Sequence, residues 1–69
     1  MIEITIKDWL KGFVALDLIN FIRSKGYGLV ESKLMVEKLL ERKEIVIRFE
    51  DDNNLDEILS MPIICEIRR

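Results

Sequence analysis

Three short stretches of the chain alternate between apolar and polar residues with a period of two. This is the pattern of a β-strand with one buried and one solvated face. The first stretch carries Ile2, Ile4 and Ile6, the second runs from Glu44 to Phe49, and the third follows directly after Pro62. In the second and third strands the residues predicted to face inward are Ile45, Ile47, Phe49, Ile63, Cys65 and Ile67.

Elsewhere the apolar residues recur every three or four positions, which indicates amphipathic helices. We predict a first helix over about Val14 to Lys25 and a second over Leu29 to about Arg42. A turn at 51–54 precedes a short third helix over about Leu55 to Met61, and Asn54 with Glu57 has the spacing of a capping box. The predicted buried stripes are Val14, Leu18, Phe21 and Ile22, with Ala15 and Ile19 at the edge, and then Leu29, Ser32, Met35, Val36, Leu39 and Leu40.

One segment, 9–13, stays open between a loop and an extra helical turn, because Gly12 is unfavourable inside a helix.

Two glycines one residue apart join the first two helices. Either Gly26 or Gly28 can adopt positive φ at no steric cost and end the first helix, so that the second begins almost at once. The resulting order is β-α-α-β-α-β. Strands with one apolar face need helices to cover it. We therefore predict one two-layer α/β (α+β) domain over residues 1–69, a three-stranded antiparallel sheet covered on one face by three helices.

The composition indicates in which cellular compartment the chain is found and which classes of partner it does not bind. The chain of 69 residues is 49% apolar and 35% charged, with a net charge of −2, so no global charge draws it to nucleic acid or anionic lipid. A single Cys65 makes no internal disulfide, which favours a reducing compartment. The N-terminus lacks the pattern of a signal peptide, and no apolar run approaches the roughly 18 residues of a membrane span. The predicted location is the cytoplasm, away from membranes.

The sequence offers little for catalysis or metal binding. It contains no His, which removes imidazole ligands and His-based triads. Cys65 alternates with inward apolar residues, as a small core side chain does. The carboxylates fall at positions predicted to be exposed, where their pKa values have little reason to shift. The run from Asp51 to Glu57 lacks the Gly and Glu positions of a calcium loop. We predict no enzyme activity, cofactor or metal.

The outward face of the predicted sheet bears on RNA binding. Its positions carry no aromatic residue on which a base could stack and three glutamates that repel phosphate, so we predict no nucleic-acid partner. These outward positions are Glu3, Thr5, Lys7, Glu44, Val46, Arg48, Ile64, Glu66 and Arg68.

The element order and the glycine corner together resemble the C-terminal domain of the bacterial ribosomal stalk protein. The corner pattern of that family is Gly-x-Gly-Leu-x-Glu-Ala-Lys-x-x-Val-Glu. The chain has Ser32 where the family has Ala, and matches it at Gly26, Gly28, Leu29, Glu31, Lys33, Val36 and Glu37. Outside residues 14–40 the resemblance rests on pattern rather than on identity.

In that family the domain docks translation factors through the exposed side of the first helix and the start of the second. The resemblance implies a translation factor or ribosome-associated protein as first candidate partner. Asn20 stands where the family usually has a lysine, and the linker before Gly26 is one residue shorter. The family's N-terminal dimerising domain and hinge have no counterpart, so we expect a free-standing relative. The matching positions are Leu16, Ile19, Arg23, Gly28, Leu29 and Lys33.

Helical periodicity leads to the same face without the family. Leu16, Asn20 and Arg23 lie together on the side of the first helix opposite its buried stripe. Their functional interpretation is a protein-docking surface with an apolar centre and a basic rim; the alternative is a solvated face with one exposed Leu. Val30 and Leu34 lie on the charged side of the second helix, and indicate either self-association as a homodimer or packing against 9–13.

Two other functions stay open. A protease adaptor resembling ClpS, a more distant relative of the same fold, is one, because Phe13 and Val14 before the first helix resemble that family. Its acidic pocket residues and His are not evident. The other is a structural subunit of a homo-oligomer built on Val30 and Leu34.

Overall fold

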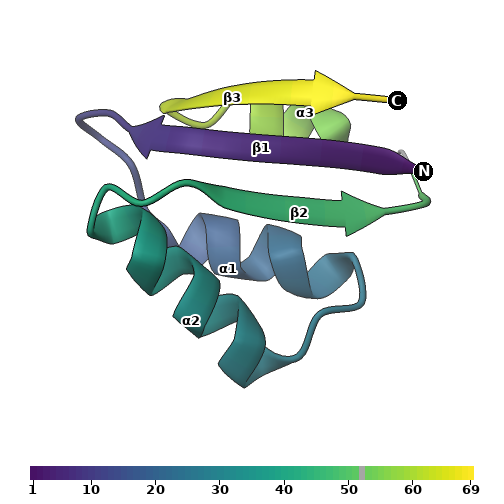
Figure 1. The fold of residues 1–69 in the computed structure, drawn as a ribbon, viewed down its shortest axis with the longest axis horizontal. Coiled ribbons are helices and arrows are strands. Elements are labelled where there is room, and N and C mark those ends of the chain that lie inside the picture. Colours follow the sequence, from purple (N-terminus) through teal and green to yellow (C-terminus); the bar gives the residue numbers. More distant parts are fainter. Residues whose placement is uncertain (52) are drawn as a thin grey trace.

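In the computed structural model, which describes residues 1–51 and 53–69, three strands and three helices alternate in the predicted order (Figure 1). The strands are β1 (Ile2–Trp9), β2 (Ile45–Phe49) and β3 (Ile63–Arg68), and the helices are α1 (Ala15–Ser24), α2 (Leu29–Leu40) and α3 (Leu55–Leu59). The strands form an antiparallel sheet in the order β2-β1-β3. The predicted fold class is confirmed. Asp52, within the predicted turn 51–54, lies outside the described residues.

The central strand is β1, and its inward face forms the floor of the core. Ile4 lies opposite Ile47 of β2 on one side and Ile67 of β3 on the other, so three isoleucines stand in one row. A bulge between Ile6 and Asp8 shifts the pairing with β3. Because opposed β-branched side chains pack well across strands, this row fixes which face of the sheet is buried.

The helices supply the rest of the core. Leu18, Phe21 and Ile22 of α1 are buried, and the Phe21 ring meets the edge of Phe49 at 6.0 Å between centroids. Ser32 of α2 is fully buried, and its hydroxyl donates to the Gly28 carbonyl at 2.7 Å, which satisfies this buried hydroxyl. A small residue here lets α2 approach its neighbours closely.

The corner between α1 and α2 uses its two glycines differently. Gly26 has φ of 99°, and its amide donates to the Arg23 carbonyl at 3.0 Å, as in a left-handed helix end. Gly28 has φ of −71° and stands at the N-cap of α2. Of the two possibilities left open by the sequence, the structure therefore selects Gly26 as the residue that ends α1.

A lysine at the same corner ties the helices to the β2–α3 connection. The Lys25 side chain is 1% exposed, and its ammonium lies 4.7 Å from the Phe49 ring centroid and 5.4 Å from that of Phe21. It donates to the main-chain carbonyls of Asp51 and Asn53. Aromatic faces and carbonyl oxygens together replace the water that a buried ammonium loses.

The ends of α2 and β1 are joined by a second cation. Arg42 has φ of 65°, which is incompatible with a continuing helix, and α2 ends at Leu40, two residues before the predicted end. Its guanidinium stacks 4.3 Å above the Trp9 ring and donates to Asp8 Oδ1 at 2.7 Å. Trp9 belongs to β1, and the residues from Leu10 to Val14 form a loop. Of the two alternatives for 9–13, the extra helical turn is therefore wrong.

Several local predictions fail at element ends. Val14, Leu29 and Leu40 were placed in the buried stripes, yet each is exposed, because all three lie at or next to the end of a helix, where the core no longer covers them. The first helix, Ala15–Ser24, agrees with its predicted bounds to within one residue at each end, and the third ends at Leu59, two residues before the predicted end. The predicted capping box is absent, since Asn54 is left-handed with φ of 65° and its side chain makes no cap bond.

Candidate protein-docking surface

The residues predicted to bind a partner lie on the helical layer. Six of them are exposed, namely Leu16, Asn20, Arg23, Gly28, Leu29 and Lys33; Ile19 is partly buried and packs against the core. We call these seven residues the helical face. It is composed of one side of α1 and the first turns of α2.

On α1 the spacing of the site residues places them on one side. Ile19, Asn20 and Arg23 follow Leu16 by three, four and seven positions. Asn20 also borders a groove shared with α3, and Ile19 leans toward the core. Leu16, 61% exposed, occupies the outward position between them. The face therefore has an apolar centre.

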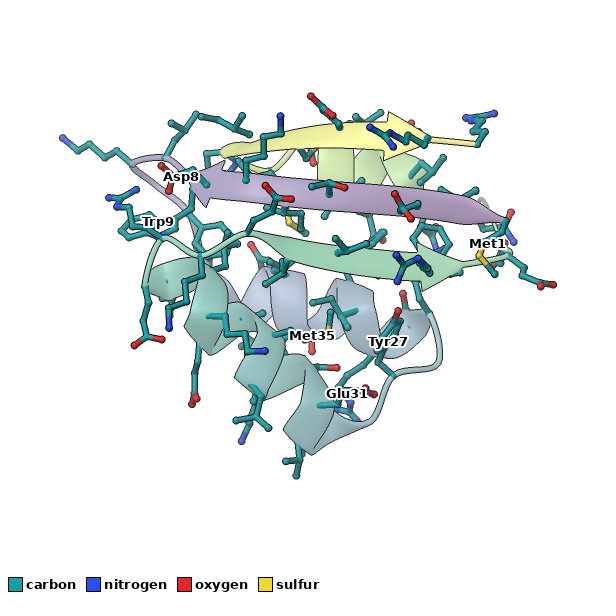
Figure 2. The ribbon with its side chains drawn as sticks, in the orientation of Figure 1. Met1, Asp8, Trp9, Tyr27, Glu31 and Met35 are labelled. Atoms are coloured by element: carbon teal, nitrogen blue, oxygen red, sulfur yellow. The ribbon has the colours of Figure 1, made fainter. Side chains whose placement is uncertain are left out.

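On α2 the site residues lie away from the sheet. Met35 is half-buried against the core, at the side of α2 next to β2 (Figure 2). Lys33 lies about 200° around the helix from Met35 at 100° per residue. Leu29 precedes Lys33 by one turn and is 43% exposed. Neither Arg23 nor Lys33 takes part in the ion pairs found among the described residues, so two cations at the face are available to a partner.

Val30 and Leu34 form a separate apolar ridge on α2, one turn apart. Their side chains are 71% and 54% exposed, which makes Val30 one of the most exposed large apolar residues of the chain. The alternative in which they pack against 9–13 is wrong, because Trp9 and Phe13 instead contact each other and the core, with ring centroids 6.1 Å apart. Self-association through this ridge stays a prediction.

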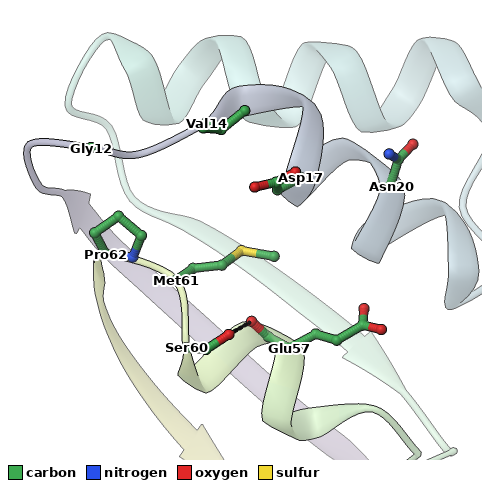
Figure 3. A pocket seen from close by; sticks show the side chains of 8 residues that line it. All are labelled: Gly12, Val14, Asp17, Asn20, Glu57, Ser60, Met61 and Pro62. Atoms are coloured by element: carbon green, nitrogen blue, oxygen red, sulfur yellow. Dashed lines mark hydrogen bonds between the residues drawn. The ribbon is translucent and has the colours of Figure 1, made fainter.

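The structure also contains a groove that the sequence did not indicate. It lies between α1 and α3, with a volume of about 400 Å³, and Asp17 and Met61 lie on its facing walls (Figure 3). Ser60 donates to the Glu57 carbonyl at 2.9 Å along the α3 wall. Segments about 40 positions apart build the groove, so no local pattern could have revealed it. It is lined by Gly12, Val14, Asp17, Asn20, Glu57, Ser60, Met61 and Pro62.

The outward face of the sheet is occupied by cross-strand ion pairs. Lys7 Nζ lies 2.8 Å from Glu66 Oε1, and Arg48 Nε lies 3.0 Å from Glu3 Oε2. The hydrogen bond from Lys7 lowers the pKa of Glu66, and the same contact raises the pKa of Lys7. At the end of β1, the hydrogen bond from Arg42 lowers the pKa of Asp8. These charges connect strands to one another and to α2.

Reactive side chains are few. Cys65 is partly buried beside the core, and burial raises the pKa of its thiol, which keeps it protonated near neutral pH. Within residues 1–51 and 53–69, no three acidic or Cys side chains are grouped so that they could hold a metal ion.

The helices are short. None in the part of the chain that the structure describes has both the length and the apolar character needed to cross a membrane.

Comparison with models of protein families, with curated proteins and with solved structures gives no significant match to this chain.

Proposed function

We propose that this chain is a non-catalytic protein-binding domain that docks its partner through the helical face. The first candidate partner is a translation factor or another ribosome-associated protein, as the resemblance of residues 26–37 to the stalk domain implies. The observation that carries the proposal is Leu16, an apolar side chain 61% exposed in the first turn of α1, on the same side as Arg23.

The chemistry of the face supports this assignment. An exposed leucine loses its contact with water when a partner covers it, and a fully buried Leu contributes about 1.5–3 kcal/mol on transfer from water. Arg23 and Lys33 at the rim would steer an acidic partner and fix its orientation. Leu29, at the first turn of α2, extends the apolar centre toward the second helix.

The test measures binding of purified translation factors to the chain and to Leu16→Asp and Arg23→Glu. Leu16→Asp places a charge at the apolar centre, and Arg23→Glu reverses a rim charge. Each change should weaken binding about tenfold or more, as for residues central to an interface. Because the rim is cationic, wild-type affinity should fall as salt rises.

The matched control is Leu59→Asp on α3, because Leu59 is 60% exposed and lies outside the helical face. The affinity of Leu59→Asp for the translation factor should equal that of the wild type. Circular dichroism and thermal melts of all variants verify that folding is intact. Equal binding by Leu16→Asp and Leu59→Asp, in folded proteins, would contradict the proposed surface.

A second candidate, an adaptor resembling ClpS, is favoured by the α1–α3 groove. Asp17 and Glu57 bring two carboxylates to a groove that also contains the apolar side chains of Val14 and Met61. Such a lining suits a peptide whose N-terminal ammonium meets the carboxylates and whose first side chain is apolar.

Fluorescence anisotropy with labelled peptides separates the two candidates. A peptide with a free N-terminal Leu or Phe should bind, its acetylated copy should not, and Asp17→Asn with Glu57→Gln should abolish the difference. Equal affinity for free and acetylated peptides would rule out the adaptor, and leaves the helical face unaffected.

A further inference from the structure

The two edges of the sheet differ in how far they are covered. At β2, the Tyr27 hydroxyl accepts from the Arg48 amide at 2.9 Å and donates to the Arg48 carbonyl at 3.0 Å, so a side chain from the α1–α2 corner occupies the outer backbone of that strand. Among the described residues, no side chain hydrogen-bonds to the backbone of β3.

The free edge is also sterically open. In Figure 1, β3 forms the border of the molecule, and α3 lies behind the sheet without extending past it. An edge strand with unpaired amides and carbonyls is a template for another strand, unless Pro or inward charges block it. Along β3 the inward positions are Ile63, Cys65 and Ile67, none of them charged, and Pro62 stands before the strand.

The outward side of β3 carries charges of both signs. Glu66 and Arg68 are exposed and two residues apart, so they stand next to each other on one face. Ile64, 47% exposed, precedes them on the same face. A strand of this kind is self-complementary when a second copy runs antiparallel to it.

We propose that β3 pairs with β3 of a second copy of this chain, antiparallel, with Ile67 opposite Ile67 of the second copy. This register places Glu66 of each copy opposite Arg68 of the other, giving two opposite-charge pairs across the two-fold axis. The two sheets become one six-stranded sheet with both helical layers on the same face.

The neighbouring registers are less favourable. A shift that sets Glu66 opposite itself brings two carboxylates together, and one that sets Arg68 opposite itself does the same for two guanidiniums. A register centred on Cys65 leaves Glu66 opposite Ile64, without a partner charge from the second copy. Glu66 already contacts Lys7 at 2.8 Å, and in the proposed register it lies between two cations.

The charge pattern also selects the occupant. An unrelated strand needs a chance match of both charges, whereas a second copy supplies both at once through symmetry. The edge is distinct from the Val30–Leu34 ridge on α2 and from the helical face, so the proposal stands or falls independently of the proposed function.

Sedimentation equilibrium at roughly 10 μM to 1 mM, the range of weak association, tests the pairing. The wild-type chain should show reversible association above its monomer mass of 8.2 kDa. Glu66→Arg alone and Arg68→Glu alone each bring like charges together, and should raise the dimer dissociation constant about tenfold or more. Mixing these two variants should restore association as a heterodimer. Each charge at position 66 or 68 of one variant then lies opposite a charge of the other sign in its partner.

The matched control is Leu34→Glu on α2, which should associate as the wild type does. Recovery on mixing also proves that both charge variants fold. A monomeric wild-type chain at every concentration would overturn the proposal. Loss of association in Leu34→Glu with full association in Arg68→Glu would overturn it too, and assign self-association to the α2 ridge.

Cross-linking tests the register. Ile67→Cys in a Cys65→Ser background should form an intermolecular disulfide under mild oxidation, because the two Ile67 positions face each other. In the wild type the two Cys65 positions lie four residues apart along the strands, about 14 Å at 3.4 Å per residue, and should not cross-link. Ready cross-linking of wild-type Cys65 without cross-linking of Ile67→Cys would exclude this register.

Discussion

At the residue scale, three neighbouring residues of the α1–α2 corner stabilise the turn in different ways. Gly26 supplies the positive φ, Lys25 fastens the corner to the β2–α3 connection, and Tyr27 reaches the edge of β2. Lys25 and Tyr27, on either side of Gly26, thus contact two distant segments. A tight helix–helix connection needs such anchors because a short loop has few apolar contacts of its own.

The two glycines of the corner yield matched substitutions. Gly26→Ala introduces a Cβ at φ of 99°, which strains the backbone although no atom lies within 4 Å, and should lower the free energy of unfolding by about 1–2 kcal/mol. Gly28→Ala, at φ of −71°, should change it by less than about 0.5 kcal/mol, since reduced chain entropy offsets a poorer N-cap. Urea denaturation monitored by circular dichroism measures both.

Equal losses at the two positions would show that the left-handed conformation of Gly26 is not what ends α1. Gly28 is also part of the helical face, so partner binding by Gly28→Ala tests whether a partner approaches the backbone there.

At the scale of elements, the sheet is held to the helices by polar contacts at its ends and by apolar packing at its centre. Arg42 joins the end of α2 to the end of β1, and Tyr27 joins the start of α2 to Arg48 near the end of β2. Between them, Val36 and Leu39 of α2 are buried. The strand β2 is therefore covered both on its inner face and at part of its edge.

Tyr27→Phe removes only the hydroxyl of this contact. We expect the Arg48 amide to exchange with solvent deuterium about tenfold faster, and the free energy of unfolding to fall by about 0.5–1.5 kcal/mol, the usual net value of one hydrogen bond. Nuclear magnetic resonance hydrogen exchange resolves the single amide, and the Ile47 amide is its internal reference. Unchanged protection of Arg48 would mean that the hydroxyl does not cover the edge in solution.

At the scale of the whole molecule, stability depends on many small contributions in a domain of 69 residues. The core consists of one row of side chains from each element, covered by charged residues that pair across strands. With no His in the chain, no side chain has an ordinary pKa between about 5 and 8, and Cys65 has a raised one. The stability of the protein should therefore change little with pH around neutrality.

The pH dependence of the free energy of unfolding follows from the groups whose pKa values are shifted. Asp8 and Glu66 have lowered pKa values, so their contribution is present above their ordinary pKa values near 4 and is lost as pH falls through the lowered values. Lys7 has a raised pKa, so its contribution is present below about 10.5 and is lost as pH rises through the raised value. Cys65 also has a raised pKa, so its contribution is present below its ordinary value of 9.0 and is lost as pH rises through the raised value. Urea midpoints should therefore be flat between about pH 5 and 8 and fall outside these limits.

Because one contact between Lys7 and Glu66 causes both of their shifts, Glu66→Gln and Lys7→Met should each weaken the acid and the alkaline dependence, and the urea midpoint should stay constant with pH between them. A transition in stability near pH 7 would contradict this account, because none of the side-chain types in this sequence has an ordinary pKa there.

The sequence alone predicted the element order and the buried face of each strand. Alternation of apolar residues is a local property, and a strand whose inward side carries isoleucines at every second position can bury only that side. It also predicted the exposure of Leu16, Asn20 and Arg23, because the helical period of α1 places them opposite Leu18 and Phe21. The bounds of α1, α2 and α3 were less accurate, because end residues lose core contacts that periodicity does not report.

Only the tertiary structure decided the strand order β2-β1-β3, the contacts of Lys25 and Tyr27, and the groove between α1 and α3. Each depends on segments far apart in the chain that meet after folding. Alternation fixes which face of a strand is buried, but not which strand lies beside it. The edge left open on β3 follows from that order, since the charges of Glu66 and Arg68 have a free neighbouring position only when β3 is not the central strand.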